Sequence, residues 1–218
     1  MLTIKTIVVT PYQQNARIMF DDESGVIVDP GGDIPMILDQ LPDHVTIQSI
    51  WITHSHIDHV SGVVALINGL KHRQSVVPKI MAHPDDKINR DHLPIQSQMM
   101  GFPYSGDFSV DQFLNHGDQL VIGNATFTVL HTPGHAIGHV SFYTESKDHS
   151  FEAPLLIAGD ALFKGSIGRT DLPGGNHQQL LDSISQHLFG LPDETIVCSG
   201  HGPNTLIGTE KSTNPFFN

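Results

Sequence analysis

The chain alternates short apolar runs with turn-forming residues along most of its length. Near the N-terminus, Ile4–Val9, Ala16–Phe20 and Val26–Val28 predict strands, separated by prolines, glycines and an acidic turn. The further strands that the same pattern predicts are Ile47–Ile52, Lys79–Ala82, Gln119–Ile122, Ala125–Leu130, His139–Thr144, Pro154–Ala158 and Thr195–Ser199. A chain with so many short strands must place them in one or more sheets.

Helical spacing of apolar residues appears between these runs. Asp33–Leu41 predicts a helix with Asp33 as its N-cap, and the apolar positions of Val63–Leu70 predict another. His177–Leu188 gives the clearest helical pattern, with Asn176 as the N-cap. Asp91–Val110 is polar and punctuated by glycine and proline, yet it carries methionines and aromatic residues. We expect this segment to be a loop that packs on the core, and a flap over a functional groove is the alternative.

Strand-rich segments that alternate with a few helices predict an α/β protein, with sheets flanked by helices. The 218 residues include 39% hydrophobic and 16% charged residues, as expected for a globular protein with a sizeable core. The chain shows no internal repeat, low-complexity tract or linker-like change of composition. We therefore expect one domain over residues 1–218.

Charge and cysteine content narrow the possible partners. The formal net charge is −12 with only 11 basic residues and no basic run, which argues against a nucleic-acid partner. The single cysteine, Cys198, permits no internal disulfide. We find no signal-peptide pattern, and no apolar run approaches the roughly 20 residues that cross a bilayer. The simplest expectation is a cytoplasmic protein with no membrane partner.

The anomaly in the composition is its fifteen histidines, three of which fall within six residues: His54, His56 and His59, with Asp58 among them. Histidine and aspartate hold Zn²⁺ or Fe²⁺ while leaving coordination positions open. Alternate side chains of an extended segment point the same way, so His54 and His56 can converge on one ion. If a helix follows, Asp58 and His59 face a neighbouring point. This layout predicts two metal ions.

Three later residues have the same character, and each follows a glycine after an apolar strand: His135, Asp160 and His201. Glycine lets backbone approach an ion closely, and strand ends are a usual place for functional residues. We expect His131 and His139 to support these residues or the packing, and His83 to be structural. The isolated histidines that we expect to be solvated are His44, His72, His92, His116, His149, His177 and His187.

The candidate ligands resemble, in order and kind, the motifs of the metallo-β-lactamase superfamily over essentially the whole chain. These seven residues are His54, His56, Asp58, His59, His135, Asp160 and His201. The resemblance implies an αββα sandwich of two mixed β-sheets, with two divalent metal ions in a groove at one sheet edge. It implies that His54, His56 and His135 bind the first ion and that Asp58, His59 and His201 bind the second, with Asp160 bridging both. Zn²⁺ is the first expectation, and Fe or Mn remain alternatives.

The segment Gly159–Asp171 resembles the short bacterial form of the glyoxalase II group, which carries a stretch similar to Gly168–Gly175. This resemblance implies hydrolysis of a glutathione thioester, S-D-lactoylglutathione, by a hydroxide held between the metals. Asp58 and Asp160 are the expected catalytic residues, with Asp58 also orienting the hydroxide. The C-terminal helical glutathione-binding domain of longer glyoxalase II enzymes is not expected here.

Arg169 is the candidate for gripping a glutathione carboxylate, because guanidinium matches carboxylate with two hydrogen bonds. A structural ion pair with Asp171 is an equally good interpretation. The nearest alternative function is that of a persulfide dioxygenase, which holds one Fe²⁺ on the equivalents of His54, His135 and Asp160. A lactonase or generic esterase is a second alternative, and a non-catalytic metal-binding protein is a third.

Overall fold

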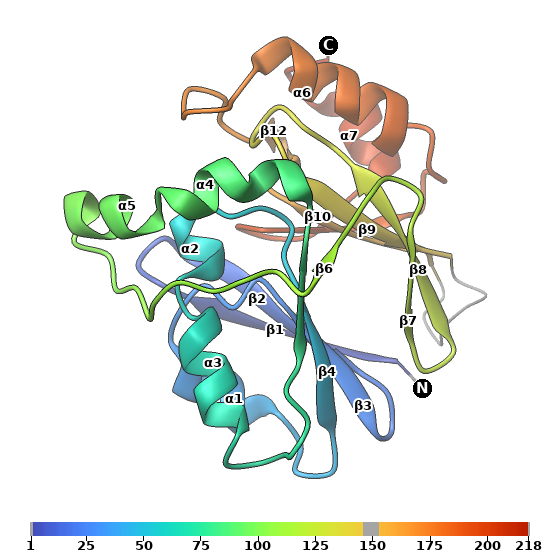
Figure 1. Cartoon of the computed structure of the whole chain (residues 1–218). Helices are drawn as coiled ribbons and strands as arrows, with labels where there is room; N and C mark the ends of the chain where they lie inside the picture. The colour runs from blue at the N-terminus through green and yellow to red at the C-terminus, as the bar shows by residue number, and fades with distance from the viewer. Residues whose placement is uncertain (1, 146–152, 218) are drawn as a thin grey trace.

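Two six-stranded mixed β-sheets form the centre of the protein in the computed structural model, which describes residues 2–145 and 153–217 (Figure 1). The strand order is β1-β2-β3-β4-β5-β6 in one sheet and β14-β13-β10-β9-β8-β7 in the other, and β11 pairs with β12 separately. The strands are β1 (Thr3–Val9), β2 (Gln14–Phe20), β3 (Ser24–Val28), β4 (Thr46–Trp51), β5 (Lys79–Ala82), β6 (Gln112–Phe113), β7 (Gln119–Ile122), β8 (Ala125–His131), β9 (Val140–Thr144), β10 (Leu155–Gly159), β11 (Leu162–Phe163), β12 (Ser166–Ile167), β13 (Ile196–Ser199) and β14 (Thr205–Leu206).

Helices cover the outer faces of both sheets (Figure 1). The helices of the first half are α1 (Ile34–Gln40), α2 (Ile57–Val60), α3 (Val63–Leu70), α4 (Lys87–Asp91) and α5 (Leu93–Met100). Those of the second half are α6 (His177–Ser183), which continues into a π-helical turn at Ile184–Leu188, and α7 (Ile207–Thr213). Among the described residues, no helix has the length and apolar character that crossing a membrane requires.

The layers follow from which way successive strand residues point. On β4, Ile50 joins the apolar cluster under α1 and α3, whereas the next residue, Trp51, points into the cluster between the sheets. There its ring lies 5.4 Å from that of Phe127 and 5.1 Å from that of Phe142. On β10, Leu156 points instead to a third cluster under α6 and α7. Because both sheets are buried on two faces, the layers run helix–sheet–sheet–helix, and the expected αββα sandwich is confirmed.

Two local expectations need correction. Asp33 precedes α1, but its backbone is left-handed (φ 48°) and its side chain makes no cap hydrogen bond. Its carboxylate instead accepts a 2.7 Å hydrogen bond from the backbone N–H of Thr10. The segment 91–110, expected as a loop, contains α5, while Phe102 is buried in the core as expected. By contrast, the cap at Asn176 is confirmed, since its Oδ1 accepts from the N–H of Gln179.

Candidate metal centre

Four loops, which follow β4, β8, β10 and β13, bring the seven residues singled out in the sequence into contact. The chain turns into α2 after His56, so Asp58 and His59 lie on the first turn of a helix, as the spacing predicts. His135, Asp160 and His201 come from the other three loops. The approach is close: a Cβ added at Gly200 would lie 2.0 Å from Oδ1 of Asp160. Glycine before His201 is therefore a steric requirement of the site.

His54, His56 and His135 form the first group. One potential ligand atom from each of these residues lies within 4.8 Å of the others. The Nε2 atoms of His54 and His135 are 3.1 Å apart, although they come from residues 81 positions apart in the chain. The alternate side chains of the extended segment after β4 therefore do converge, as predicted.

Asp58, His59 and His201 form the second group, whose potential ligand atoms also lie within 4.8 Å of one another. Nε2 of His201 is 3.2 Å from Oδ2 of Asp58 and 3.4 Å from Nε2 of His59. A helical turn and a loop 142 residues further along the chain thus supply one cluster.

Asp160 lies between the two groups. Its Oδ2 is 3.6 Å from Nε2 of His135 in the first group and 3.4 Å from Nε2 of His201 in the second. Its Oδ1 is 3.4 Å from Nε2 of His59. A carboxylate in this position can contact ions in both groups.

Oxygen atoms outside the cluster fix the orientation of its imidazoles. Nδ1 of His135 donates to the backbone carbonyl of Arg169 at 2.7 Å, and Nδ1 of His201 donates to that of Tyr12 at 2.9 Å. Nδ1 of His59 lies 2.9 Å from a carboxylate oxygen of buried Asp29. With the Nδ1 protons placed in these bonds, the Nε2 lone pairs point into the cluster.

Burial and neighbouring charge set the protonation of the site. Burial lowers the pKa of His56 to about 3 and holds the pKa of His54 well below its usual range. Burial also opposes protonation of His59, but the carboxylates of Asp160 and Asp58 outweigh it and raise its pKa. Burial alone would raise the pKa of Asp160, yet the surrounding imidazoles lower it. The centre therefore combines ionised carboxylates with imidazoles of two kinds: His54 and His56 are neutral, whereas the carboxylates favour a proton on His59.

This donor set fits a pair of divalent cations. Oδ1 of Asp160 is a buried carboxylate oxygen with no hydrogen-bond partner among the described residues. Burying a charged oxygen without a partner is costly, and a cation beside it removes that cost. The nitrogen and oxygen donors suit Zn²⁺, Fe²⁺ or Mn²⁺, and the donor set alone does not select among them.

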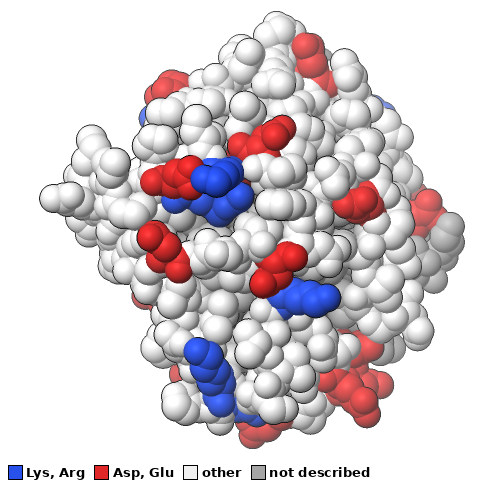
Figure 2. All heavy atoms as spheres, viewed as in Figure 1, with Lys and Arg blue, Asp and Glu red and all other residues white. Residues whose placement is uncertain are grey.

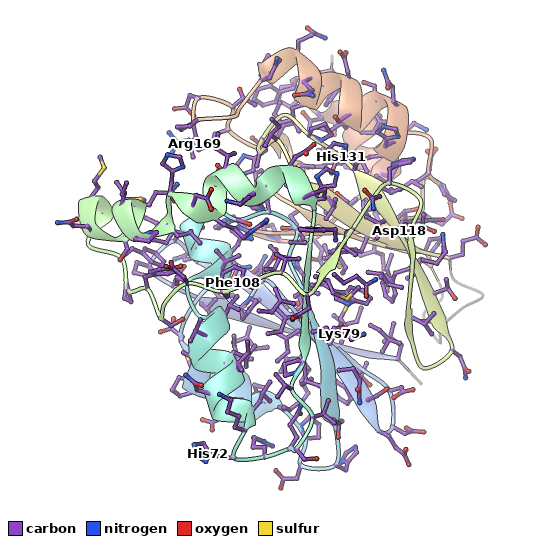
Figure 3. All side chains as sticks on the ribbon, in the orientation of Figure 1. His72, Lys79, Phe108, Asp118, His131 and Arg169 are labelled. Carbon is purple, nitrogen blue, oxygen red and sulfur yellow. The ribbon has the colours of Figure 1, made fainter. Side chains whose placement is uncertain are left out.

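The supporting histidines behave as expected from the sequence. Nε2 of buried His139 accepts a 3.0 Å hydrogen bond from the backbone N–H of Asp160, and its Nδ1 contacts Oγ1 of Thr132 at 2.8 Å. His139 therefore fixes the backbone of a cluster residue. The rings of His83 and His131 stack at 4.1 Å, beside α4, where Figure 3 labels His131. Neither belongs to the groups that can hold an ion among the described residues.

Arg169 takes part in the centre through its backbone. Its carbonyl orients His135, while its exposed guanidinium forms two 2.7 Å hydrogen bonds with Asp171. These bonds hold the pKa of Asp171 at about 2. The ion pair expected as one interpretation is thus present, and Figure 3 shows Arg169 on the loop that precedes α6.

Asp29 is a residue of the site that the sequence reasoning missed. Besides contacting His59, its carboxylate accepts from the backbone N–H of Thr53 at 2.7 Å and from the Thr53 hydroxyl at 2.6 Å. It comes directly after β3 and before Pro30-Gly31-Gly32. An acidic residue directly after an apolar strand and before a glycine turn was the available signal. It resembles the signal for Asp160, which follows an apolar strand and a glycine.

Comparison with known proteins agrees with this geometry. The sequence profile of the metallo-beta-lactamase superfamily matches residues 9–201. The hydroxyacylglutathione hydrolase GloC of Haemophilus influenzae is 36% identical over 221 residues, covering 100% of this chain and 99% of that protein.

Two crystal structures share the whole fold. That of the BLEG-1 B3 metallo-beta-lactamase is 38% identical with a TM-score of 0.84, over 99% of this chain and 100% of that one. That of TTHA1623 in a di-iron-bound form is 33% identical with a TM-score of 0.83, over 97% and 99%. The chain belongs to the metallo-beta-lactamase superfamily and is one of its metal-dependent hydrolases.

Proposed function

We propose that this protein hydrolyses glutathione thioesters in the manner of glyoxalase II, converting S-D-lactoylglutathione to D-lactate and glutathione. The observation that carries the proposal is that the glyoxalase II-like stretch Gly168–Gly175 is built into the centre, where the Arg169 carbonyl orients His135. The full-length similarity to a hydroxyacylglutathione hydrolase supports the same substrate class.

In this proposal His54, His56 and His135 hold one divalent ion, Asp58, His59 and His201 hold the other, and Asp160 contacts both. When bound, such ions lower the pKa of water toward neutrality and polarise a carbonyl group. Zinc is our first choice, and the di-iron form of a relative with 33% identity supports iron as the alternative.

Asp58 has a second role as the group that orients the attacking water. Burial works against its ionisation, but His59 and His201 outweigh burial and lower its pKa. An ionised carboxylate accepts a hydrogen bond from water and can take its proton. The water oxygen bonds to the thioester carbon, the carbon–sulfur bond breaks, and glutathione leaves as a thiolate that then takes up a proton.

Arg169 is the proposed contact for a carboxylate of the glutathione moiety. Its guanidinium is exposed, so exchanging Asp171 for a substrate carboxylate requires no burial of an unpaired charge. The two groups of the pair are similarly accessible, with 62% and 67% of their side-chain surfaces exposed.

The test combines metal analysis with a substrate panel. Protein purified without added metal is analysed for its ion content, and hydrolysis of S-D-lactoylglutathione is followed by the loss of thioester absorbance. We expect two ions per chain and saturable hydrolysis. A fully metallated protein that leaves this thioester intact contradicts the proposal.

The other members of the panel identify the alternatives. Oxygen consumption with glutathione persulfide by a protein holding one iron indicates a persulfide dioxygenase. Faster cleavage of a lactone or simple ester than of the thioester indicates a lactonase or esterase. A β-lactam belongs in the panel because a structural relative with 38% identity is a B3 metallo-beta-lactamase.

A further inference from the structure

A cavity of about 630 Å³ lies away from the metal centre, between α4, the start of α5 and the segment 104–113. The side chains around it that matter most are Lys87, Arg90, Tyr104, Phe108 and Phe113. Figure 3 labels Phe108 on the segment that leads from α5 to β6. None of the seven metal-centre residues lines this cavity. Its volume falls in the range of roughly 300–1,000 Å³ that is usual for small-molecule sites.

Arg90 stands out among the chain's four arginines, all of which are described. Arg17 donates hydrogen bonds to two backbone carbonyls. Arg73 donates to two backbone carbonyls and to the carboxylate of Asp43. Arg169 donates two hydrogen bonds to the carboxylate of Asp171. The half-buried guanidinium of Arg90 has one long hydrogen bond, 3.5 Å, to the backbone carbonyl of His83. Within the described residues, no carboxylate lies at ion-pair distance from it.

The other charged side chains around the cavity already have a hydrogen-bond partner. Nζ of Lys87 lies 2.8 and 2.6 Å from the two carboxylate oxygens of Asp91. The carboxylate of Asp107 accepts a 2.8 Å hydrogen bond from the Tyr104 hydroxyl. Arg90 is therefore the one positive group of the described lining with no carboxylate at ion-pair distance. Asp86 and Asp91 act on its charge only from further away, so its N–H donors are open to a bidentate acceptor.

Aromatic side chains supply the rest of the chemistry. Tyr104 and Phe108 pack on the core beside the cavity, whereas Phe113 is 54% exposed at its edge. On the described surface that Figure 2 shows, acidic and basic side chains are scattered singly or in small groups, without one extended charged surface. Such a cavity suits a compact ligand with an apolar body better than a polyanion.

We propose that this Arg90 cavity is a second binding site, which takes an organic monoanion with a planar aromatic body and a carboxylate. The carboxylate accepts two hydrogen bonds from Arg90, and the aromatic body lies against Tyr104, Phe108 and Phe113. A phosphate dianion is disfavoured because Asp91 and Asp107 line the same cavity. The proposal does not depend on which substrate the metal centre takes.

The probes are 2-naphthoate, its neutral amide 2-naphthamide and the dianion 2-naphthyl phosphate, each titrated calorimetrically into the metal-loaded protein. We expect 2-naphthoate to bind at least about tenfold more tightly than the other two, because it gains a charge-assisted bidentate contact. Equal binding of the acid and the amide overturns the proposal, as does tighter binding of the phosphate or the absence of any naphthoate binding.

Variants locate the site. Arg90→Gln should weaken 2-naphthoate binding by about tenfold and leave 2-naphthamide binding unchanged. Arg169→Gln is the matched control, because it removes an arginine beside the metal centre and should leave naphthoate binding intact. Magnetisation transfer from naphthoate protons to Tyr104 or Phe113 should be seen in the unsubstituted protein. Unchanged binding by Arg90→Gln, or transfer only to metal-centre residues, places the carboxylate elsewhere and overturns the proposal.

Discussion

The guanidinium of Arg17 donates a 2.6 Å hydrogen bond to the backbone carbonyl of Ser199, two residues before His201. Arg17 is fully buried on β2, and its other terminal nitrogen donates to the carbonyl of Asn15. Asn15 in turn donates through its side chain to the carbonyls of Ser199 and Gly202, at 3.0 and 2.9 Å. Two polar side chains of the first sheet thus hold the loop of the second sheet that presents His201.

Arg17→Met should loosen this loop, because the Asn15 carbonyl loses the Arg17 donor inside the protein and the Ser199 carbonyl keeps only the donor of the Asn15 side chain. An unsatisfied buried group costs about 1–3 kcal/mol, so the free energy of unfolding should fall by roughly that amount. Metal content should fall as well, since His201 is less firmly placed. Denaturant unfolding and metal analysis measure the two effects.

The matched control for Arg17→Met is Arg73→Met. It also removes hydrogen bonds to two backbone carbonyls, but at the surface and not at the loop that presents His201. It should leave the metal content unchanged. If Arg17→Met lowers stability without any change in metal content, the contact is structural and does not position His201.

Asp58→Ala should depress turnover and metal occupancy together, because the carboxylate belongs to the second group and is the proposed orienting group for water. We expect one of two ions to be lost and hydrolysis to fall by at least about 100-fold, the lower end of general-base contributions. The surface variant Asp193→Asn, which breaks only the Lys211 ion pair, is the control. Full activity with two ions retained would remove Asp58 from the mechanism.

Asp29→Asn tests a residue that supports the centre without belonging to either proposed ligand set. Its carboxylate contacts Nδ1 of His59 and both the backbone and the hydroxyl of Thr53. Replacing one oxygen by an amide nitrogen removes an acceptor, so His59 loses the charge that fixes its ring. Partners of this kind are worth about 10–100-fold in metal affinity. A competitive chelator titration measures it, and an unchanged affinity would contradict the role.

The difference between predicted and missed residues has a physical cause. His54, His56, Asp58 and His59 could be found because strand and helix geometry act over a few neighbouring residues. Asp160 stood out because an acidic residue follows an apolar strand and a glycine. These local signals predicted the cluster, and its resemblance to the motifs of the metallo-β-lactamase superfamily implied the sandwich.

Contacts set by sheet pairing could not be found in this way. Nothing in the sequence of β2 indicates that Arg17 faces the Ser199 carbonyl, 182 residues away, because that contact depends on how the two sheets pack. The helix α5 was missed because its apolar residues are spread around it, with Met99 83% exposed and Leu93 buried. Pro94 in its first turn also resembled loop punctuation, although proline is well tolerated there.

Arg169→Ala separates the two ways in which this residue can act. The His135 contact is made by the Arg169 backbone carbonyl, which the substitution keeps, so metal content and kcat should change little. The guanidinium is lost, so KM for an anionic glutathione thioester should rise by roughly tenfold, the effect of one exposed charge-assisted contact.

Asp171→Ala is the informative partner variant, because it frees the guanidinium from its 2.7 Å hydrogen bonds and should lower KM or leave it unchanged. If Arg169→Ala leaves KM unchanged, the side chain serves the Asp171 pair alone and only the backbone belongs to the site. A fall in metal content in Asp171→Ala would instead show that the ion pair holds the loop in place for His135.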